Sequence, residues 1–324
     1  MNDVERIAIP TPFQIGRVNC YAITRGSLTL IDPGPLTDDA YTELTDSLEG
    51  LGYATEDVDR VLITHPHIDH FGLADRIRNE SEATICAHRD AVDVLADPTA
   101  NFEREQAFFR PYLASVGVPE QLLETVVTLP ESYNRFREPV AVDRALAEGD
   151  EIVLDETTTL EAIHTPGHAP ASVCFLDRER QSAFTGDHVM ADISPNPLLT
   201  LEPGTTDQRT RSLPDYLAAL EHIATEDVTT GYGGHRDIIP DIPNRVEEIV
   251  AHHDERSDRV SGLLADHGPM TPYKLMTLEF PDLPATETFA GMSEIIGHLD
   301  VLEDASRVEK VERDEQSTYE LIDA

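Results

Sequence analysis

Thr64-His65-Pro66-His67-Ile68-Asp69-His70 follows directly on an apolar run, Val61-Leu62-Ile63. The run predicts a short buried strand, so the three histidines and the aspartate lie at its C-terminal end, on the loop before a helix that begins near Gly72. Imidazole and carboxylate groups at this density suit a borderline divalent metal, above all zinc. His65 and His67 alternate and can turn toward one ion, whereas Asp69 and His70 can turn toward a second.

Three later segments repeat one pattern: a β-rich run, a glycine, and then a ligand-type side chain. His168 follows Gly167, Asp187 follows Gly186, and His235 follows the pair 233–234. Each glycine lets the backbone turn tightly. Loops at strand ends are where metal-binding and catalytic groups usually sit, because the strands hold them rigidly.

The order of these segments resembles the metallo-β-lactamase-fold hydrolases, whose pattern is HxHxDH, then a distant His, an Asp and a last His. All four segments occur in this order between residues 65 and 235, and Leu30-Ile31-Asp32-Pro33-Gly34 resembles the family's strand and turn around an aspartate. The resemblance implies an α/β fold, the αββα sandwich, and a metal-dependent hydrolase. The motifs are specific to the superfamily but say little about the substrate.

Carried over residue by residue, the resemblance implies two zinc ions per chain, with iron or manganese as alternatives. His164 and His188 flank ligands without matching ligand positions, so we expect them beside the site or on the surface. The implied ligands are His65, His67 and His168 for one ion, Asp69, His70 and His235 for the other, and Asp187 as a bridge between them.

Two neighbouring divalent ions can share a water and lower its pKa from ~15.7 toward neutrality, so that a bridging hydroxide becomes the nucleophile. An adjacent ion takes up the negative charge that develops on a carbonyl or phosphoryl oxygen. Asp69 and Asp187 are therefore the expected catalytic carboxylates. Cys20, Cys86 and Cys174 lie in or beside apolar runs and are expected to be small buried residues rather than nucleophiles.

The length of 324 residues favours two domains. We predict a catalytic domain over 1–242, with helices over 37–51 and 213–223. A smaller domain is predicted over 243–324. Within it, helices over 243–265, 271–278 and 286–302 and a hairpin of 307–311 with 318–322 follow a winged-helix order. This part resembles the C-terminal domain of the lactamase-β-2-like and glyoxalase-II-like branch.

A winged helix raises the question of DNA binding, which needs a net basic face. The presumed recognition helix carries Glu287, Glu294 and Asp300, and His298 is its one basic-type residue. DNA binding is therefore not expected, and the domain is assigned a role in packing or at the rim of the substrate site.

A helical insertion over about 97–140 is a candidate lid, because it holds about a third of the aromatic residues of the chain. Its arginines could pair with an anionic group on a substrate. The residues concerned are Phe102, Phe108, Phe109, Tyr112, Tyr133 and Phe136, with Arg104, Arg110, Arg135 and Arg137.

The sequence favours hydrolysis of a carboxylic ester or thioester with a small-molecule acyl substrate. Two alternatives stay open: a phosphodiesterase or RNA endonuclease, and a metal-binding regulator that acts through its winged helix. A basic groove beside the metals would favour RNA, and a closed aromatic pocket would favour an acyl group. A homo-oligomer is possible, and no segment predicts membrane insertion.

Acidic residues dominate the chain, with 62 Asp and Glu against 24 Lys and Arg and a formal charge of −38. Lys274 and Lys310 are the only lysines. Self-repulsion of this size destabilises a compact state in dilute buffer. The composition therefore predicts a halophilic protein of a salt-rich cytoplasm, and three dispersed cysteines without a signal peptide fit that compartment.

We expect the melting temperature to rise steeply between dilute buffer and molar KCl, because the Debye length falls to about 3 Å and screens the repulsion. Thermal denaturation across a KCl series measures this. A melting temperature that stays flat across the series would contradict the halophilic interpretation.

Overall fold

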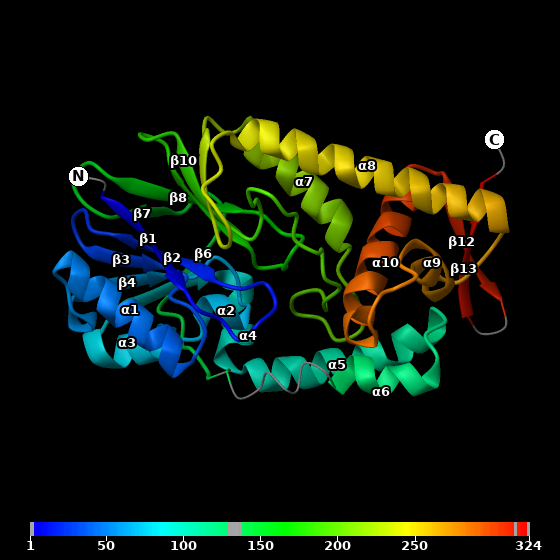
Figure 1. Ribbon diagram of the computed structural model, residues 1–324, viewed down its shortest axis with the longest axis horizontal. Helices are drawn as coiled ribbons and strands as arrows, with labels where there is room; N and C mark the ends of the chain where they lie inside the picture. Colours follow the sequence, from blue (N-terminus) through cyan, green and yellow to red (C-terminus); the bar gives the residue numbers. More distant parts are fainter. Residues whose placement is uncertain (1–2, 129–135, 137, 314–315, 323–324) are drawn as a thin grey trace.

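The chain folds into a two-sheet sandwich flanked by helices, with a helical half packed beside it (Figure 1). This computed structural model describes residues 3–128, 136, 138–313 and 316–322. Among them, no helix is long and apolar enough to cross a membrane.

Two mixed sheets form the centre of the sandwich. The first has the order β1-β2-β3-β4-β5-β6, and the second has the order β11-β10-β9-β8-β7. The first sheet comprises β1 (Val4–Ile9), β2 (Val18–Ile23), β3 (Leu28–Ile31), β4 (Val58–Leu62), β5 (Thr84–His88) and β6 (Arg144–Leu146). The second comprises β7 (Glu151–Val153), β8 (Thr159–His164), β9 (Val173–Asp177), β10 (Ser182–Gly186) and β11 (Thr230–Gly233).

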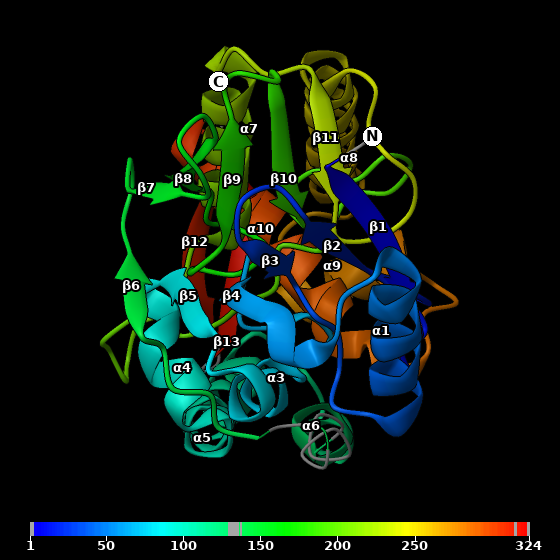
Figure 2. The same cartoon turned by 90° about the vertical axis from the view of Figure 1, so that its left-hand side faces the viewer.

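Apolar side chains face both ways from each sheet, which divides the core into three layers. Tyr21 and Leu62 of the first sheet meet Phe175 and Phe184 of the second. Outside the first sheet pack α1 (Asp38–Leu51), α2 (Ile68–Phe71) and α3 (Ala74–Ser81). Outside the second pack α7 (Ser212–Thr225) and the first half of α8 (Ile242–His267). This is the predicted αββα sandwich, and Figure 2 shows α7 and α8 behind the strands of the second sheet, with α1 and α3 on the side of the first.

The strand directions bring the ends of several strands to one edge of the sandwich. β3 and β4 are parallel in the first sheet, and β10 and β11 are parallel in the second. β8 runs in the same sense as β10, because each is antiparallel to β9 between them. The carboxyl ends of β3 and β4 therefore share one direction in the first sheet, as do those of β8, β10 and β11 in the second, and the carboxyl ends of strands are where α/β folds bind ligands.

The helices and the hairpin begin and end close to the predicted residues. The predicted 37–51 helix is α1, whose N-cap Thr37 accepts a hydrogen bond from the Ala40 amide at 3.1 Å. The predicted 286–302 helix begins slightly later, at α10 (Thr288–Asp304), after a short 3-10 turn, η4 (Ala285–Glu287). The hairpin is β12 (Val308–Arg313) with β13 (Gln316–Leu321), and its turn lies outside the described residues.

The insertion and the C-terminal half share one apolar core. The insertion supplies α5 (Pro98–Ser115) and α6 (Glu120–Thr128), reached through η2 (Arg89–Ala91) and α4 (Val92–Ala96). Phe109 and Leu113 of α5 pack with side chains of α8, α9 (Pro272–Glu279) and α10. The predicted order of three helices and a hairpin is present, and α8 begins beside the predicted domain boundary. The winged-helix assignment and the division into separate domains stay predictions.

Helix α10 is enclosed on nearly all sides, unlike a helix that reads DNA. Its acidic residues Glu294 and Asp300 are 5% and 1% exposed. The Arg209 guanidinium donates to both oxygens of Asp300 at 2.6 Å, and Arg256 pairs with Glu294. Two of the three acidic residues that the sequence placed on a recognition helix thus lie inside the protein as neutralised pairs, whereas Glu287 lies in η4 and is partly exposed.

Candidate metal centre

The seven predicted ligands converge at the shared edge of the two sheets. His65, His67, Asp69 and His70 follow β4, and His168, Asp187 and His235 follow β8, β10 and β11 in turn. Five of the seven are buried, and His67 and Asp69 are partly buried. Every residue that the sequence assigned to the metals therefore lies in one cluster.

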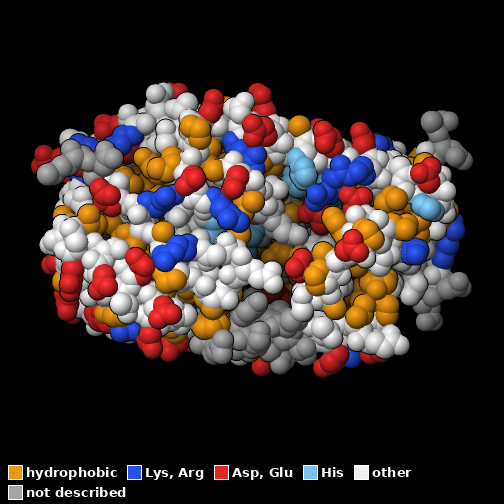
Figure 3. All heavy atoms as spheres, in the orientation of Figure 1, with side chains coloured by type: hydrophobic (Ala, Val, Ile, Leu, Met, Phe, Trp, Pro, Cys, Tyr) orange, Lys and Arg blue, Asp and Glu red, His pale blue; other side chains and the backbone are white. Residues whose placement is uncertain are grey.

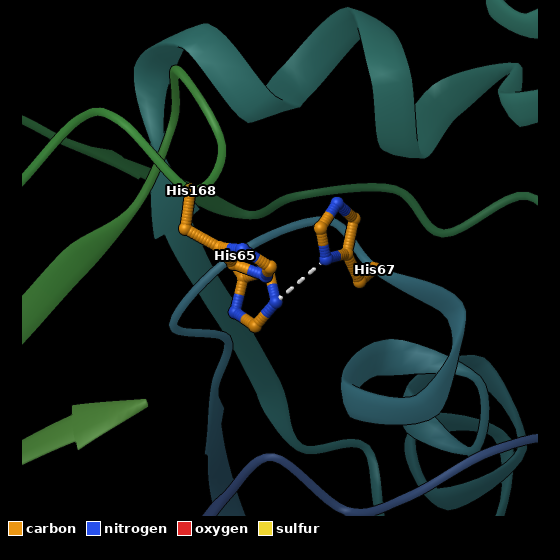
Figure 4. A group of neighbouring side chains, drawn as sticks. All are labelled: His65, His67 and His168. Carbon is orange, nitrogen blue, oxygen red and sulfur yellow. Dashed lines mark hydrogen bonds between the residues drawn. The ribbon is translucent and has the colours of Figure 1, made fainter. Parts of the chain in front are cut away.

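Three of the histidines form one half of this cluster. Potential ligand atoms of His65, His67 and His168 all lie within 4.8 Å of one another. His65 Nε2 and His67 Nδ1 are 3.0 Å apart, and the ring of His168 completes the group (Figure 4). Two nitrogens at about 2.1 Å from one tetrahedral zinc ion would be roughly 3.4 Å apart, close to this spacing.

Carboxylates and two more histidines form the other half. His235 Nε2 lies 3.4 Å from Asp69 Oδ2 and 3.5 Å from Asp187 Oδ2. His70 Nε2 is 3.5 Å from Asp187 Oδ1, while the other oxygen of Asp187 is 3.6 Å from His168 Nε2. Asp187 therefore faces both halves of the cluster, as a bridging group must.

Each of three predicted ligands, all histidines, is oriented by a hydrogen bond from its outer ring nitrogen. His70 Nδ1 donates to Asp32 Oδ2 at 2.9 Å, and His168 Nδ1 donates to the Asn196 carbonyl at 3.0 Å. His235 Nδ1 donates to the Arg17 carbonyl at 2.7 Å. In a neutral imidazole, such a bond places the proton on the outer nitrogen and leaves the inner nitrogen free, which is how proteins present imidazole to a metal.

The inner atoms fit a divalent metal. His70 Nε2, His168 Nε2 and Asp187 Oδ1 are buried polar atoms with no hydrogen-bond partner in the described part of the chain. Buried polar groups are almost always paired, so such a convergence indicates a missing partner. The absence of a side chain at Gly234 leaves room for the Asp187 carboxylate, because a Cβ at this position would lie 2.3 Å from Asp187 Oδ1.

Burial keeps the three-histidine half uncharged. Burial, reinforced by His70 and His67, holds the pKa of His65 well below its ordinary value. Burial and the neighbouring His168 lower the pKa of His67 to about 3. Burial likewise lowers the pKa of His168. All three rings therefore offer lone pairs at neutral pH, so no proton has to leave before a metal binds.

The carboxylate half attracts cations. Burial opposes it, yet Asp187 and Asp69 raise the pKa of His70 well above its ordinary value, and Asp187 raises that of His235 in the same way. Burial would also raise the pKa of Asp187, but the charges of His70 and His235 hold it well below the usual range. A field that keeps protons on buried imidazoles favours a metal cation at the same place.

Side chains that the sequence placed outside the ligand set behave differently. His188 is 1% exposed, so it is buried beside the cluster and does not lie on the surface. His164 donates from Nε2 to the Pro170 carbonyl at 2.7 Å. Cys20, Cys86 and Cys174 are buried, and burial raises the pKa of each thiol, that of Cys174 to about 12. The prediction that they are buried is confirmed.

Two supporting residues hold the loops of the cluster: the sequence marked the turn at Asp32 without giving its role, and it gave no signal at Tyr216. Asp32, with φ of 53°, accepts from the Thr64 amide at 2.8 Å and the Thr64 hydroxyl at 2.6 Å as well as from His70. Tyr216 of α7 donates to the His188 carbonyl at 2.9 Å, one residue after Asp187. A Cβ at Gly167, one residue before His168, would lie 2.4 Å from the Tyr216 Cα. Tyr216 thus contacts two of the metal loops at once.

We expect Tyr216→Phe to weaken metal binding by roughly tenfold, the low end of the effect of removing a ligand's own hydrogen-bond partner, because the hydroxyl holds the His188 carbonyl next to Asp187 and not a ligand side chain. The hydroxyl is lost while the ring and its packing stay, and the His188 carbonyl is left buried and unpaired. Competition with a chromogenic chelator measures the affinity. Tyr41→Phe is the matched control, because the Tyr41 hydroxyl donates to Glu80 at 2.6 Å on α3, in the layer outside the first sheet. Equal affinities in the two variants would contradict a positioning role for Tyr216.

The chain matches proteins of known family along nearly its whole length. The family model for the metallo-beta-lactamase superfamily matches residues 14–235. A Bacillus subtilis protein named "Probable metallo-hydrolase YqjP" is 30% identical over 301 residues, which are 93% of this chain and 92% of the relative. An atrochrysone carboxyl ACP thioesterase of Claviceps purpurea is 26% identical over 144 residues, 44% of this chain and 41% of that protein.

A solved structure shares the architecture, including the C-terminal half. The crystal structure of a metallo-beta-lactamase family protein from Thermus thermophilus superposes with a TM-score of 0.82 at 27% identity, and the match covers 99% of both chains. The matched segment contains all seven predicted ligands, and their donor set suits divalent metals. The chain therefore belongs to the metallo-beta-lactamase superfamily of metal-dependent hydrolases.

Proposed function

We propose that the chain is a dinuclear zinc hydrolase of carboxylic esters or thioesters. The observation that carries this proposal is a cavity of about 860 Å³ that opens beside the metal cluster and runs along the insertion. His67 and Asp69 form part of its wall, so a substrate in the cavity touches the metal centre directly. Figure 3 shows histidine side chains in a hollow near the middle of the molecule.

The lining of the cavity suits an acyl group. Most of its accessible wall is apolar, as in sites that bind uncharged small molecules. Among the described wall residues, arginines are outnumbered by carboxylates even without the predicted ligand Asp69. The charged residues are Arg89 and Arg104 against Asp90, Asp93, Glu105 and Glu202.

The charge of the cavity wall and the burial of α10 each argue against one of the two alternative functions. An RNA phosphodiesterase needs a positive groove that follows the phosphate backbone, and this wall is net acidic. A regulator that acts through its winged helix needs an accessible reading helix, but α10 is buried within the C-terminal core. A thioesterase among the relatives agrees with acyl chemistry.

The residues of the centre have distinct roles in the proposed reaction. One ion would be held by His65, His67 and His168. The other ion would be held by Asp69, His70 and His235, and Asp187 would contact both ions. Bound divalent ions activate a water and polarise the carbonyl oxygen that it attacks.

Proton transfer falls to Asp69, which borders both the cluster and the cavity. Its carboxylate is placed to take the proton that the attacking water gives up and to return it to the leaving alkoxide or thiolate.

Purified protein is expected to carry close to two ions per chain, with zinc as the metal identified by elemental analysis. Asp187→Ala should abolish hydrolysis and lower the metal content, because it removes the group that faces both halves of the cluster. His188→Ala removes a buried ring next in sequence but no ligand, so it should lower thermal stability and keep both ions. Equal metal loss in the two variants would show that the bridge has been assigned to the wrong residue.

A panel of esters, thioesters, lactones and bis-nitrophenyl phosphate tests the reaction class. We expect measurable kcat/KM for the acyl compounds and little for the phosphodiester, and chelation should remove the activity. The Asp69→Asn variant should also lose activity toward the acyl compounds. Turnover of the phosphodiester in preference to every acyl compound would replace the proposed function with the nuclease alternative.

A further inference from the structure

We propose that the acyl group of the substrate is large and apolar, and that its far end binds against Phe109 of the insertion and Phe289 of the C-terminal half. The proposal rests on the ester or thioester hydrolysis proposed above and adds the substrate class. It also gives the C-terminal half a task, because that half supplies one wall of the cavity.

The cavity is built from segments that are far apart in the sequence. One wall comes from α4 and α5, another from the loop 198–206, and a third from Phe289 at the start of α10. The rings of Phe109 and Phe289 meet edge to face, with centroids 5.4 Å apart and planes at 85°. Insertion and C-terminal half are therefore joined at the cavity itself.

Charged and apolar lining residues differ in their burial. Phe102, Phe109 and Leu199 are 8%, 3% and 1% exposed. Arg89, Asp93 and Arg104 are among the charged members, and all three are exposed. An apolar group that enters between the charges can thus reach a buried aromatic region while its ester bond stays at His67 and Asp69.

Hydrogen bonds fix the distance between Phe289 and the metal centre. The Asn196 carbonyl accepts from His168, and the Asn196 side-chain amide donates to the Ala290 carbonyl at 3.1 Å, next to Phe289. The Leu199 amide donates to Ser293 Oγ at 3.1 Å on the same helix. The loop that orients one predicted ligand is thereby attached to α10, so the position of the aromatic wall is set relative to the reacting bond.

The volume favours a large acyl group. About 860 Å³ lies near the upper end of the ~300–1,000 Å³ typical of small-molecule sites. An acetyl group would leave most of this space in contact with water, whereas a medium-length alkyl or an aromatic acyl group would fill it. Each methylene moved from water into the wall should raise kcat/KM about fourfold, until the chain reaches the end of the cavity.

The decisive experiment compares nitrophenyl acetate, butyrate, octanoate and dodecanoate on the metal-loaded full-length enzyme. For the wild type, kcat/KM should rise about fourfold per methylene from acetate to octanoate. Phe289→Ala and Phe109→Ala should lower the octanoate-to-acetate ratio at least tenfold and leave acetate within about twofold. Phe289→Leu, a milder change, should give an intermediate ratio if the alanine variant folds poorly.

Matched controls separate a specificity role from general loss of structure. Phe108 is the neighbour of Phe109 and stacks on Tyr112 with centroids 5.8 Å apart, and Phe280 packs in the same core as Phe289. Neither is among the described residues that line the cavity. Phe108→Ala and Phe280→Ala should therefore retain the wild-type ratio even where their melting temperatures fall.

The outcomes distinguish this proposal from the one on which it rests. If the wild type hydrolyses all four esters at similar kcat/KM, the substrate class proposed here is wrong, although ester hydrolysis stands. If the Phe289 and Phe109 variants lose acetate and octanoate activity equally, these rings do not bind the acyl end. If no ester or thioester is hydrolysed and the phosphodiester is, the proposed function itself has failed.

Discussion

Bringing imidazoles and carboxylates together out of water is the constraint on which the rest of this structure depends. Isolated buried charges cost several kcal/mol each unless they are paired or bind a metal. Here every inner atom needs a cation, and the outer atoms need protein partners from several elements. The Asp32 carboxylate holds His70, the Asn196 carbonyl holds His168, and the Arg17 carbonyl holds His235. The two sheets, their parallel strand ends and helix α7 all serve to deliver these partners to one place.

Local sequence patterns predicted the metal ligands, whereas contacts between residues distant in the chain could not be predicted. A His-rich stretch after an apolar strand is visible in the sequence because strand, turn and ligands are adjacent in the chain. Asn196 acts through its backbone carbonyl, which any residue possesses, so no side-chain signal marks it. Tyr216 looks like any apolar position of an amphipathic helix until the fold places it beside the metal loops. Helices were predicted within a few residues, but the common core of the insertion and the C-terminal half depends on contacts across more than a hundred residues.

Buried and exposed acidic residues obey different rules in this chain. Exposed carboxylates interact through water, so their mutual repulsion depends on salt. Asp300 is instead held by a bidentate arginine inside the protein, where ions in solution screen little. The near absence of lysine agrees with this arrangement, because only the planar guanidinium matches a carboxylate at two points. From the sequence, Glu294 and Asp300 could not be told apart from solvent-facing acids, since their partners Arg256 and Arg209 lie far away along the chain.

Helix α8 extends over 26 residues, about 39 Å, and belongs to two cores at once. Val246 and Ile249 near its start pack on the sandwich, whereas Val260 and Leu264 near its end pack in the C-terminal half. Arg245 also donates from Nε to the Met190 carbonyl at 2.8 Å, three residues beyond Asp187. The helix is therefore fixed at both ends, by the sandwich at its start and by the C-terminal core at its end. A chimaera that exchanges C-terminal halves between relatives therefore has no neutral junction: a crossover inside α8 divides one core or the other, and a crossover before Ile242 separates the C-terminal half from α5 and α6, with which it shares a core.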